Sequence, residues 1–273
     1  MMATLNREAY TAAAEKLTAD TQTATAAQLA TAADEILSVA RLLRGEPRLR
    51  RALTDPSRGG DDRSELFRSL VAGKLGTTTV DALATLVAGR FSRPSELLDA
   101  TERLGVDTVL ASAAKADKLA EVEDELFRFG QVVSGNPQLA VTLSDPSAAV
   151  DRRVKLVQDL LKGKSEAATA QLIAVALEGF GGRSFETSLS RLVELTAAKR
   201  DREVAYVTVA KLLDDAEEQR LAAKLSDIYG RQVSLKVDVD PSIIGGLSVR
   251  VGSDLYDGTI LRRLNQARQA FAK

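Results

Sequence analysis

An internal repeat constrains the fold of this chain more than any other feature of its sequence. Residues 45–57 (GEPRLRRALTDPS) align without a gap with residues 135–147 (GNPQLAVTLSDPS), and the register continues through Gly73-Lys74 and Gly163-Lys164. Two pairs of prolines and a shared Asp-Pro-Ser lie in this register, which a common Ala/Leu-rich composition would not produce. The sequence therefore predicts two copies of one structural unit.

Each copy has the pattern of antiparallel helices. In the second copy, apolar residues recur at helical spacing from Leu119 to Val133, and Gly135 and Pro137 then end the helix. The first copy repeats this pattern from Leu29 to Leu43. Because the connections are short, neighbouring helices should pack as a bundle. Further helices are predicted near residues 6–16, 138–143, 151–161, 165–177 and 184–199.

The periodicity changes after residue 200. Apolar and polar residues alternate over residues 233–239 and 247–251, as in strands with one buried face, and residues 204–209 are a third strand candidate. A helix with acidic residues in its first turn precedes the second strand and ends at Gly230, and a last helix should span residues 260–271. The order is strand–helix–strand–strand–helix, with a short hairpin before the last helix.

These patterns predict a mainly α protein, with two tandem helical bundles followed by a small α/β domain. The expected domains are residues 1–105 for the first bundle, 106–200 for the second bundle and 201–273 for the α/β domain.

The composition excludes several classes of function. The chain contains no His, Cys or Trp, so zinc fingers, thiol nucleophiles and His-dependent triads are excluded. The formal net charge of −1 argues against a nucleic-acid-binding protein. No signal peptide and no apolar run of membrane-spanning length is apparent, so we expect a cytoplasmic chain that meets a membrane through partners.

No group of residues has the pattern of a catalytic, cofactor-binding or metal-binding site. Gly163-Lys164-Ser165 has the tail of a phosphate-binding loop, but the glycine required five residues earlier is Gln158, inside a predicted helix. Asp214, Asp215, Glu217 and Glu218 lie where a helix N-terminus favours negative charge, so capping explains them better than a cation site. A generic helical adaptor and, less favoured, a phosphate-binding enzyme at residues 163–165 remain alternatives.

The C-terminal segment DPSIIGGLSVRVGSDLYDGTILRRLNQARQAF, residues 240–271, resembles the end of the delta subunit of bacterial F-type ATP synthase. The mitochondrial counterpart of that family is the oligomycin-sensitivity-conferring protein (OSCP). The resemblance extends over about residues 106–273, through Asp145-Pro146-Ser147 and the predicted helix near residues 183–195. The residues that match the family motif are Asp240, Pro241, Ile244, Gly245, Gly246, Val249, Arg250, Gly252, Asp257 and Gly258.

This resemblance implies a non-catalytic subunit of the peripheral stalk, the stator that holds the catalytic head still during proton-driven ATP synthesis. It implies that the helical domain binds N-terminal helices of the α subunits and that the C-terminal domain binds the C-terminus of the b subunit. It also implies a place at the cytoplasmic face of the bacterial plasma membrane, without cofactors. This chain departs from the family pattern because its helical domain occurs twice. A second copy would bind a second α-subunit helix or stiffen the joint, and the b subunit should be a separate chain.

Overall fold

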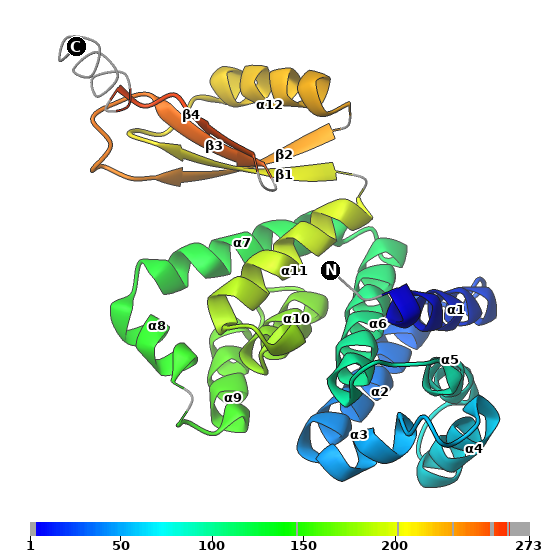
Figure 1. Ribbon diagram of the computed structural model, residues 1–273. Coiled ribbons are helices and arrows are strands. Elements are labelled where there is room, and N and C mark those ends of the chain that lie inside the picture. Colours follow the sequence, from blue (N-terminus) through cyan, green and yellow to red (C-terminus); the bar gives the residue numbers. More distant parts are fainter. Residues whose placement is uncertain are drawn as a thin grey trace, which may run out of the picture. The chain divides into compact units, whose positions relative to one another are not determined.

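The computed structural model describes residues 4–145, 147–200, 202–230, 232–251, 254–260 and 262 (Figure 1). The chain forms two compact units, and each is described by itself. The first unit comprises residues 1–122 and 141–189, and the second comprises residues 123–140 and 190–273.

The first unit is helical. Its most extensive helix–helix contact is between α2, Ala26–Gly45, and α6, Pro94–Lys115, which run antiparallel (Figure 1). Thr25 caps α2: its hydroxyl accepts a hydrogen bond from the Gln28 N–H, and the Gln28 side chain accepts one from the Thr25 N–H at 2.8 Å. The other helices that lie within this unit are α1 (Thr4–Asp20), α3 (Pro47–Leu53), α4 (Gly60–Val71), α5 (Thr77–Ala88), α9 (Val150–Leu161), α10 (Ala167–Leu177) and the 3-10 turn η1 (Phe180–Gly182).

The repeat predicted from the sequence is present in the helix boundaries. Helices α4 and α9 begin and end at equivalent residues, and Gly73 and Gly163, which follow them, have φ values of 71° and 70°. By the same register, α2 corresponds to α7 (Leu119–Ser134), α3 to α8 (Pro137–Ser144) and α5 to α10. Helix α6 corresponds to α11 (Phe185–Lys199). Its own first seventeen residues, 94–110, also correspond to α1.

Helix α6 therefore takes part in both copies. It is the last helix of the first copy and the first helix of the second copy. It runs unbroken through residue 105, the predicted boundary between the first two domains. The division into three domains stays a prediction.

The second unit contains a four-stranded mixed sheet with the strand order β2-β1-β3-β4. The strands are β1 (Arg202–Val209), β2 (Gln232–Val239), β3 (Leu247–Val251) and β4 (Asp254–Asp257). β1 and β2 are parallel and are joined through α12 (Asp215–Tyr229), whereas β3 and β4 add antiparallel strands. The predicted acidic cap is confirmed, because the Asp214 carboxylate accepts a hydrogen bond from the Glu217 N–H at 2.7 Å.

The predicted strand order lacks one strand of this sheet. Residues 254–257, where the sequence predicts a short hairpin, pair antiparallel with β3 as strand β4. Four mostly exposed residues carry no alternation that would reveal a strand. The predicted last helix, residues 260–271, falls largely outside the described residues.

The two faces of the sheet differ in chemistry. Ala205, Val207 and Val209 of β1 lie on the face that packs against α12, together with Leu225 of that helix. The opposite face presents Tyr206, Ser234 and Lys236, which meet α7 and α11. Within the described residues, no helix has both the length and the apolar character needed to cross a membrane.

Candidate interaction surfaces

Most of the residues of the predicted family motif shape the connections around β3. Asp240 follows β2: its N–H donates to the Val209 carbonyl, and its carboxylate accepts from the Ser242 N–H at 2.9 Å. Hydrogen bonds from Ser242 lower the pKa of the Asp240 carboxyl. Gly246 has a φ of 84°, and a Cβ there would lie 2.5 Å from the Gly258 carbonyl oxygen, so glycine is required.

The rest of the motif lies on β3 and at the end of β4. Val249 is buried in the core, and the Arg250 guanidinium lies over the Tyr206 ring, 4.8 Å from its centroid. Asp257 accepts a hydrogen bond from the Thr259 N–H, which lowers the pKa of the Asp257 carboxyl. Ile244 is exposed, Pro241 lies in the turn after β2, and Gly252 falls outside the described residues.

The loop at Gly163-Lys164-Ser165 connects two helices. It joins α9 to α10, and the Lys164 N–H donates to the Leu161 carbonyl. No strand leads into it, so the local geometry is that of a helix C-terminus rather than a phosphate-binding loop.

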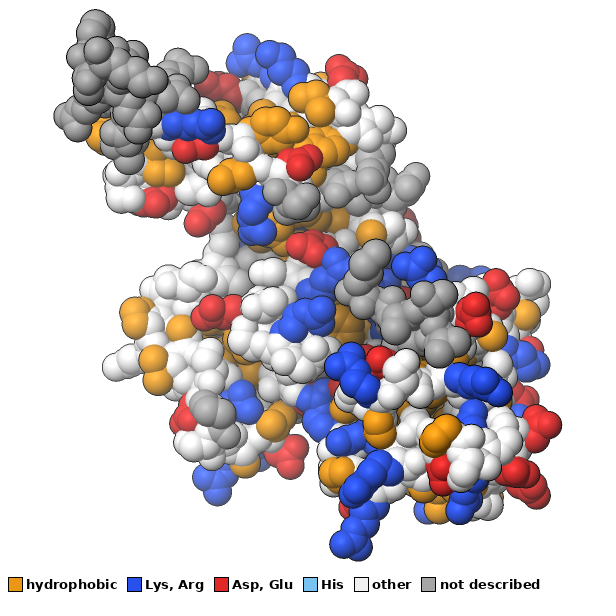
Figure 2. All heavy atoms as spheres, in the orientation of Figure 1, with side chains coloured by type: hydrophobic (Ala, Val, Ile, Leu, Met, Phe, Trp, Pro, Cys, Tyr) orange, Lys and Arg blue, Asp and Glu red, His pale blue; other side chains and the backbone are white. Residues whose placement is uncertain are grey.

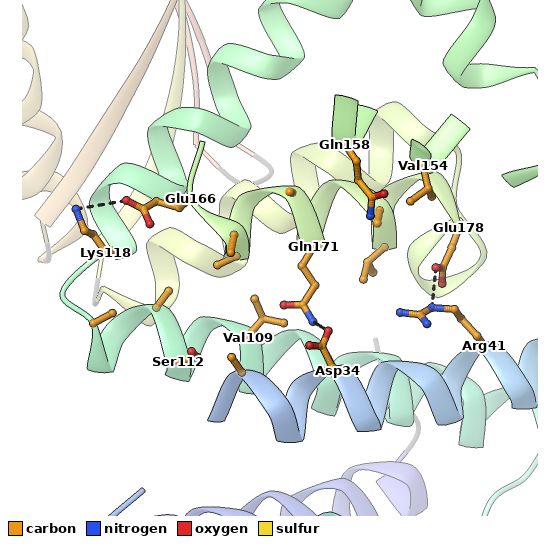
Figure 3. A pocket seen from close by; sticks show the side chains of 18 of the residues that line it. Asp34, Arg41, Val109, Ser112, Lys118, Val154, Gln158, Glu166, Gln171 and Glu178 are labelled. Carbon is orange, nitrogen blue, oxygen red and sulfur yellow. Dashed lines mark hydrogen bonds and ion pairs between the residues drawn. The ribbon is translucent and has the colours of Figure 1, made fainter. Parts of the chain in front are cut away.

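A cleft of about 600 Å³ lies in the first unit between α2 and α6 on one side and α9 and α10 on the other (Figure 3). The Gln171 side-chain amide donates to the Asp34 carboxylate at 2.6 Å across its middle. At one end Arg41 pairs with Glu178 at 3.1 Å, and burial raises the pKa of the Glu178 carboxyl. Lys118 pairs with Glu166 at 3.3 Å at the other end. The cleft is therefore crossed by polar pairs.

The outer face of α1 is a shallow groove of about 370 Å³. The side chains that line it are small or polar: Tyr10, Thr11, Ala14, Glu15, Thr18, Ala19 and Gln22. Tyr10 anchors this helix by donating a hydrogen bond to Asp107 of α6. An open face of small residues lets another helix approach closely.

The module of α12 and the sheet exposes apolar side chains, which gather along α12 and the strands beside it in Figure 2. Ile228 of α12 is 64% exposed and Leu255 of β4 is 63% exposed. Among the described residues β4 is an edge strand, and the outer backbone groups of an edge strand can pair with a partner. Other exposed apolar side chains of this module are Leu212, Val239, Ile244, Tyr256 and Ile260.

A buried ionic cluster joins the sheet to α7 within the second unit. Glu123 of α7 is fully buried and pairs with Arg200 at 2.6 Å and with Lys236 of β2 at 3.1 Å. It also accepts a hydrogen bond from the Ser234 hydroxyl at 2.7 Å, and Asp124 gives Lys236 a second carboxylate at 2.7 Å. Sequence reasoning missed this cluster, because Arg200, Ser234 and Lys236 lie 77 or more residues from Glu123 in the chain.

The arrangement defines a class of protein: a helical connector with open helix and sheet surfaces. Within the described part of the chain, no group of three or more acidic side chains could hold a metal ion. The buried Glu102 carboxylate has structural partners, because it accepts hydrogen bonds from Arg44 and from the Gly181 N–H.

Comparison with known proteins gives the particular family. The family model for the ATP synthase delta (OSCP) subunit matches residues 107–271. The ATP synthase subunit delta of Salinispora arenicola (strain CNS-205) is 58% identical over 273 residues, and that of Salinispora tropica is 56% identical, with both chains covered completely in each case. The subunit of Streptomyces griseus is 41% identical over 271 residues, covering 99% of this chain and 100% of its own. The chain belongs to the ATP synthase delta (OSCP) subunit family and is a non-catalytic subunit of the peripheral stalk.

Proposed function

We propose that this chain links the catalytic head of the ATP synthase to the b subunit, at the cytoplasmic face of the plasma membrane. The helical part binds N-terminal helices of the α subunits, and the C-terminal module binds the C-terminus of the b subunit. Full-length similarity to delta subunits carries the proposal. The chain then resists the torque of the rotor without taking part in chemistry.

The surfaces of the chain have the chemistry that such contacts require. The open face of α1 suits an amphipathic helix, which binds by placing its apolar side against small residues. The exposed Ile228 and Leu255 of the C-terminal module offer apolar area to a second partner.

Binding to the head is tested with a synthetic peptide of the first twenty residues of the α subunit from the same organism. We expect calorimetry to give saturable binding to the full chain and no binding of a scrambled peptide. Absence of binding to the α-subunit peptide would contradict the head-binding part of the proposal.

Binding to the stalk is tested with a soluble C-terminal fragment of the b subunit. The variant Leu255→Asp places a charge in the exposed apolar surface of the C-terminal module and should weaken binding at least tenfold. Leu70→Asp is the matched control, because Leu70 is 42% exposed on α4 and lies outside this module. If the two variants bound the b-subunit fragment with equal affinity, the surface around Leu255 would not be its binding site.

A further inference from the structure

The repeat allows the two copies to be compared position by position. Four residues on one face of α6 have equivalents one repeat earlier, three on α1 and the fourth in the turn that follows it. On α6 this face is covered: Glu102, Gly105 and Val109 are buried and Ser112 is half-buried. The equivalent positions are open: Ala12, Glu15 and Ala19 on α1 and Gln22 in the turn after it are all exposed.

Helix α2 is what covers the face on α6. A Cβ on Gly105 would lie 2.6 Å from a methyl carbon of Leu37, so the glycine allows α2 to approach closely. The Ser112 hydroxyl donates to the Ala26 carbonyl at 2.7 Å, and Arg44 pairs with Glu102 at the other end of the contact. Contacts with α6 therefore occur along most of the length of α2.

The cleft beside α2 is already bridged by polar side chains. Between α2, α6, α9 and α10 it is crossed by the Asp34–Gln171 and Arg41–Glu178 pairs. A second helix would have to displace α2 or break these pairs.

We propose that α2 is the resident helix of the second copy and that the helix-binding face of α6 is therefore closed. Of the two equivalent faces, the one on α1 remains open, so the chain takes one partner helix rather than two. Its occupant is an amphipathic helix that packs an apolar stripe against Ala12 and Ala19 and carries a basic residue for Glu15. This inference rests on the proposed function, because it takes the N-terminal helix of the α subunit as the occupant.

The number of peptides bound per chain tests the proposal. Calorimetry of the full chain with the α-subunit peptide should give a stoichiometry of one. The variant Ala12→Arg should raise the Kd at least tenfold, whereas Ala223→Arg, at an exposed alanine of α12, should leave it unchanged. Two peptides per chain, or full affinity of Ala12→Arg, would overturn the proposal.

A disulfide tests the position of α2 without any partner. Because the chain has no cysteine, Ala26→Cys combined with Ser112→Cys provides a unique pair across the contact between α2 and α6. We expect the pair to oxidise completely and the oxidised chain to bind one peptide with a Kd within twofold of that of the reduced chain. If oxidation lowered the stoichiometry from two to one, α6 would be a second docking face and the proposal would be wrong.

The outcomes separate this inference from the proposed function. A chain that binds no peptide would contradict binding to the head and the use of the α1 face together. Complete formation of the disulfide in that chain would still support α2 as the resident helix, and failure of the disulfide to form would overturn that part as well.

Discussion

At the scale of single residues, buried polar side chains hold the ends of helices in place. Arg63 is 4% exposed, and its guanidinium donates to the carbonyls of Val87, Ala88 and Gly89 at the end of α5 at 3.2, 2.9 and 2.8 Å. It also donates to two carbonyls of the loop before α4. One planar cation thus satisfies carbonyl groups that a helix end leaves without partners.

We therefore expect Arg63→Lys to lower the free energy of unfolding by about 2–4 kcal/mol, because an ammonium group cannot reach all these carbonyls. Urea unfolding followed by circular dichroism measures this change. Arg58→Lys serves as the control, since the Arg58 side chain is half exposed and the change should stay within about 0.5 kcal/mol. Equal effects of the two substitutions would contradict the assigned role.

Two aspartates at equivalent positions of the repeat should make the stability of the chain depend on pH. Asp55 and Asp145 accept hydrogen bonds from the hydroxyl and N–H of Ser57 and Ser147, and these bonds lower the pKa of both carboxyls. A carboxyl whose pKa is lower in the folded chain than in the unfolded chain stabilises the fold. This contribution is fully present above the unfolded pKa of about 3.9 and is lost as the pH falls through the folded pKa.

Ser57→Ala should consequently raise the pKa of Asp55 toward its ordinary value while leaving that of Asp145 unchanged. Carbon-detected NMR titration of the carboxyl groups measures both in one sample. Movement of both pKa values, or of neither, would show that the serine is not the cause.

At the scale of elements, one close contact fixes how α2 lies against α6. Gly105→Ala places a methyl group 2.6 Å from Leu37, which is 3% exposed and has little room to move. The overlap should destabilise the chain by about 1–3 kcal/mol, although alanine favours a helix by about 1 kcal/mol over glycine. Thermal and urea unfolding test this prediction.

Gly45→Ala is the matched control for that substitution. Gly45 ends α2, and a Cβ there would have no atom within 4 Å. We expect a neutral or slightly stabilising effect. A neutral Gly105→Ala would indicate that α2 and α6 can separate easily, which would also weaken the inference that α2 is resident.

At the scale of the whole molecule, the ionic cluster of Glu123 fixes the sheet to α7 within the second unit. The equivalent residue in the first copy is Ala33, which is also fully buried, so the charge belongs to the copy that adjoins the sheet. Removing one member of a buried ion pair costs more than the pair contributes, because the other charge stays buried.

Glu123→Gln should therefore destabilise the chain by about 3 kcal/mol, and Lys236→Met by a similar amount. The double variant should lose less stability than the sum of the two single losses, and the difference is a coupling energy of about 1–3 kcal/mol. A urea-unfolding double-mutant cycle measures this coupling. Additive costs would mean that the two side chains act independently.

The sequence alone determined the pattern of elements and the family. The repeat predicted equivalent helices, alternation predicted two of the four strands, and residues 204–209 were a third strand candidate. Helical and strand periods could be read because they are local properties of the chain. The sequence could not reveal the short strand β4, nor that α6 serves both copies.

Only the tertiary structure decided which surfaces are open. Glu15 and Gly105 occupy equivalent positions in the repeat, but only the folded chain shows that α2 buries one and leaves the other exposed. Likewise, Glu123, Arg200 and Lys236 meet because α7, α11 and β2 pack together. Burial and pairing depend on residues far apart in the chain, so no local pattern encodes them.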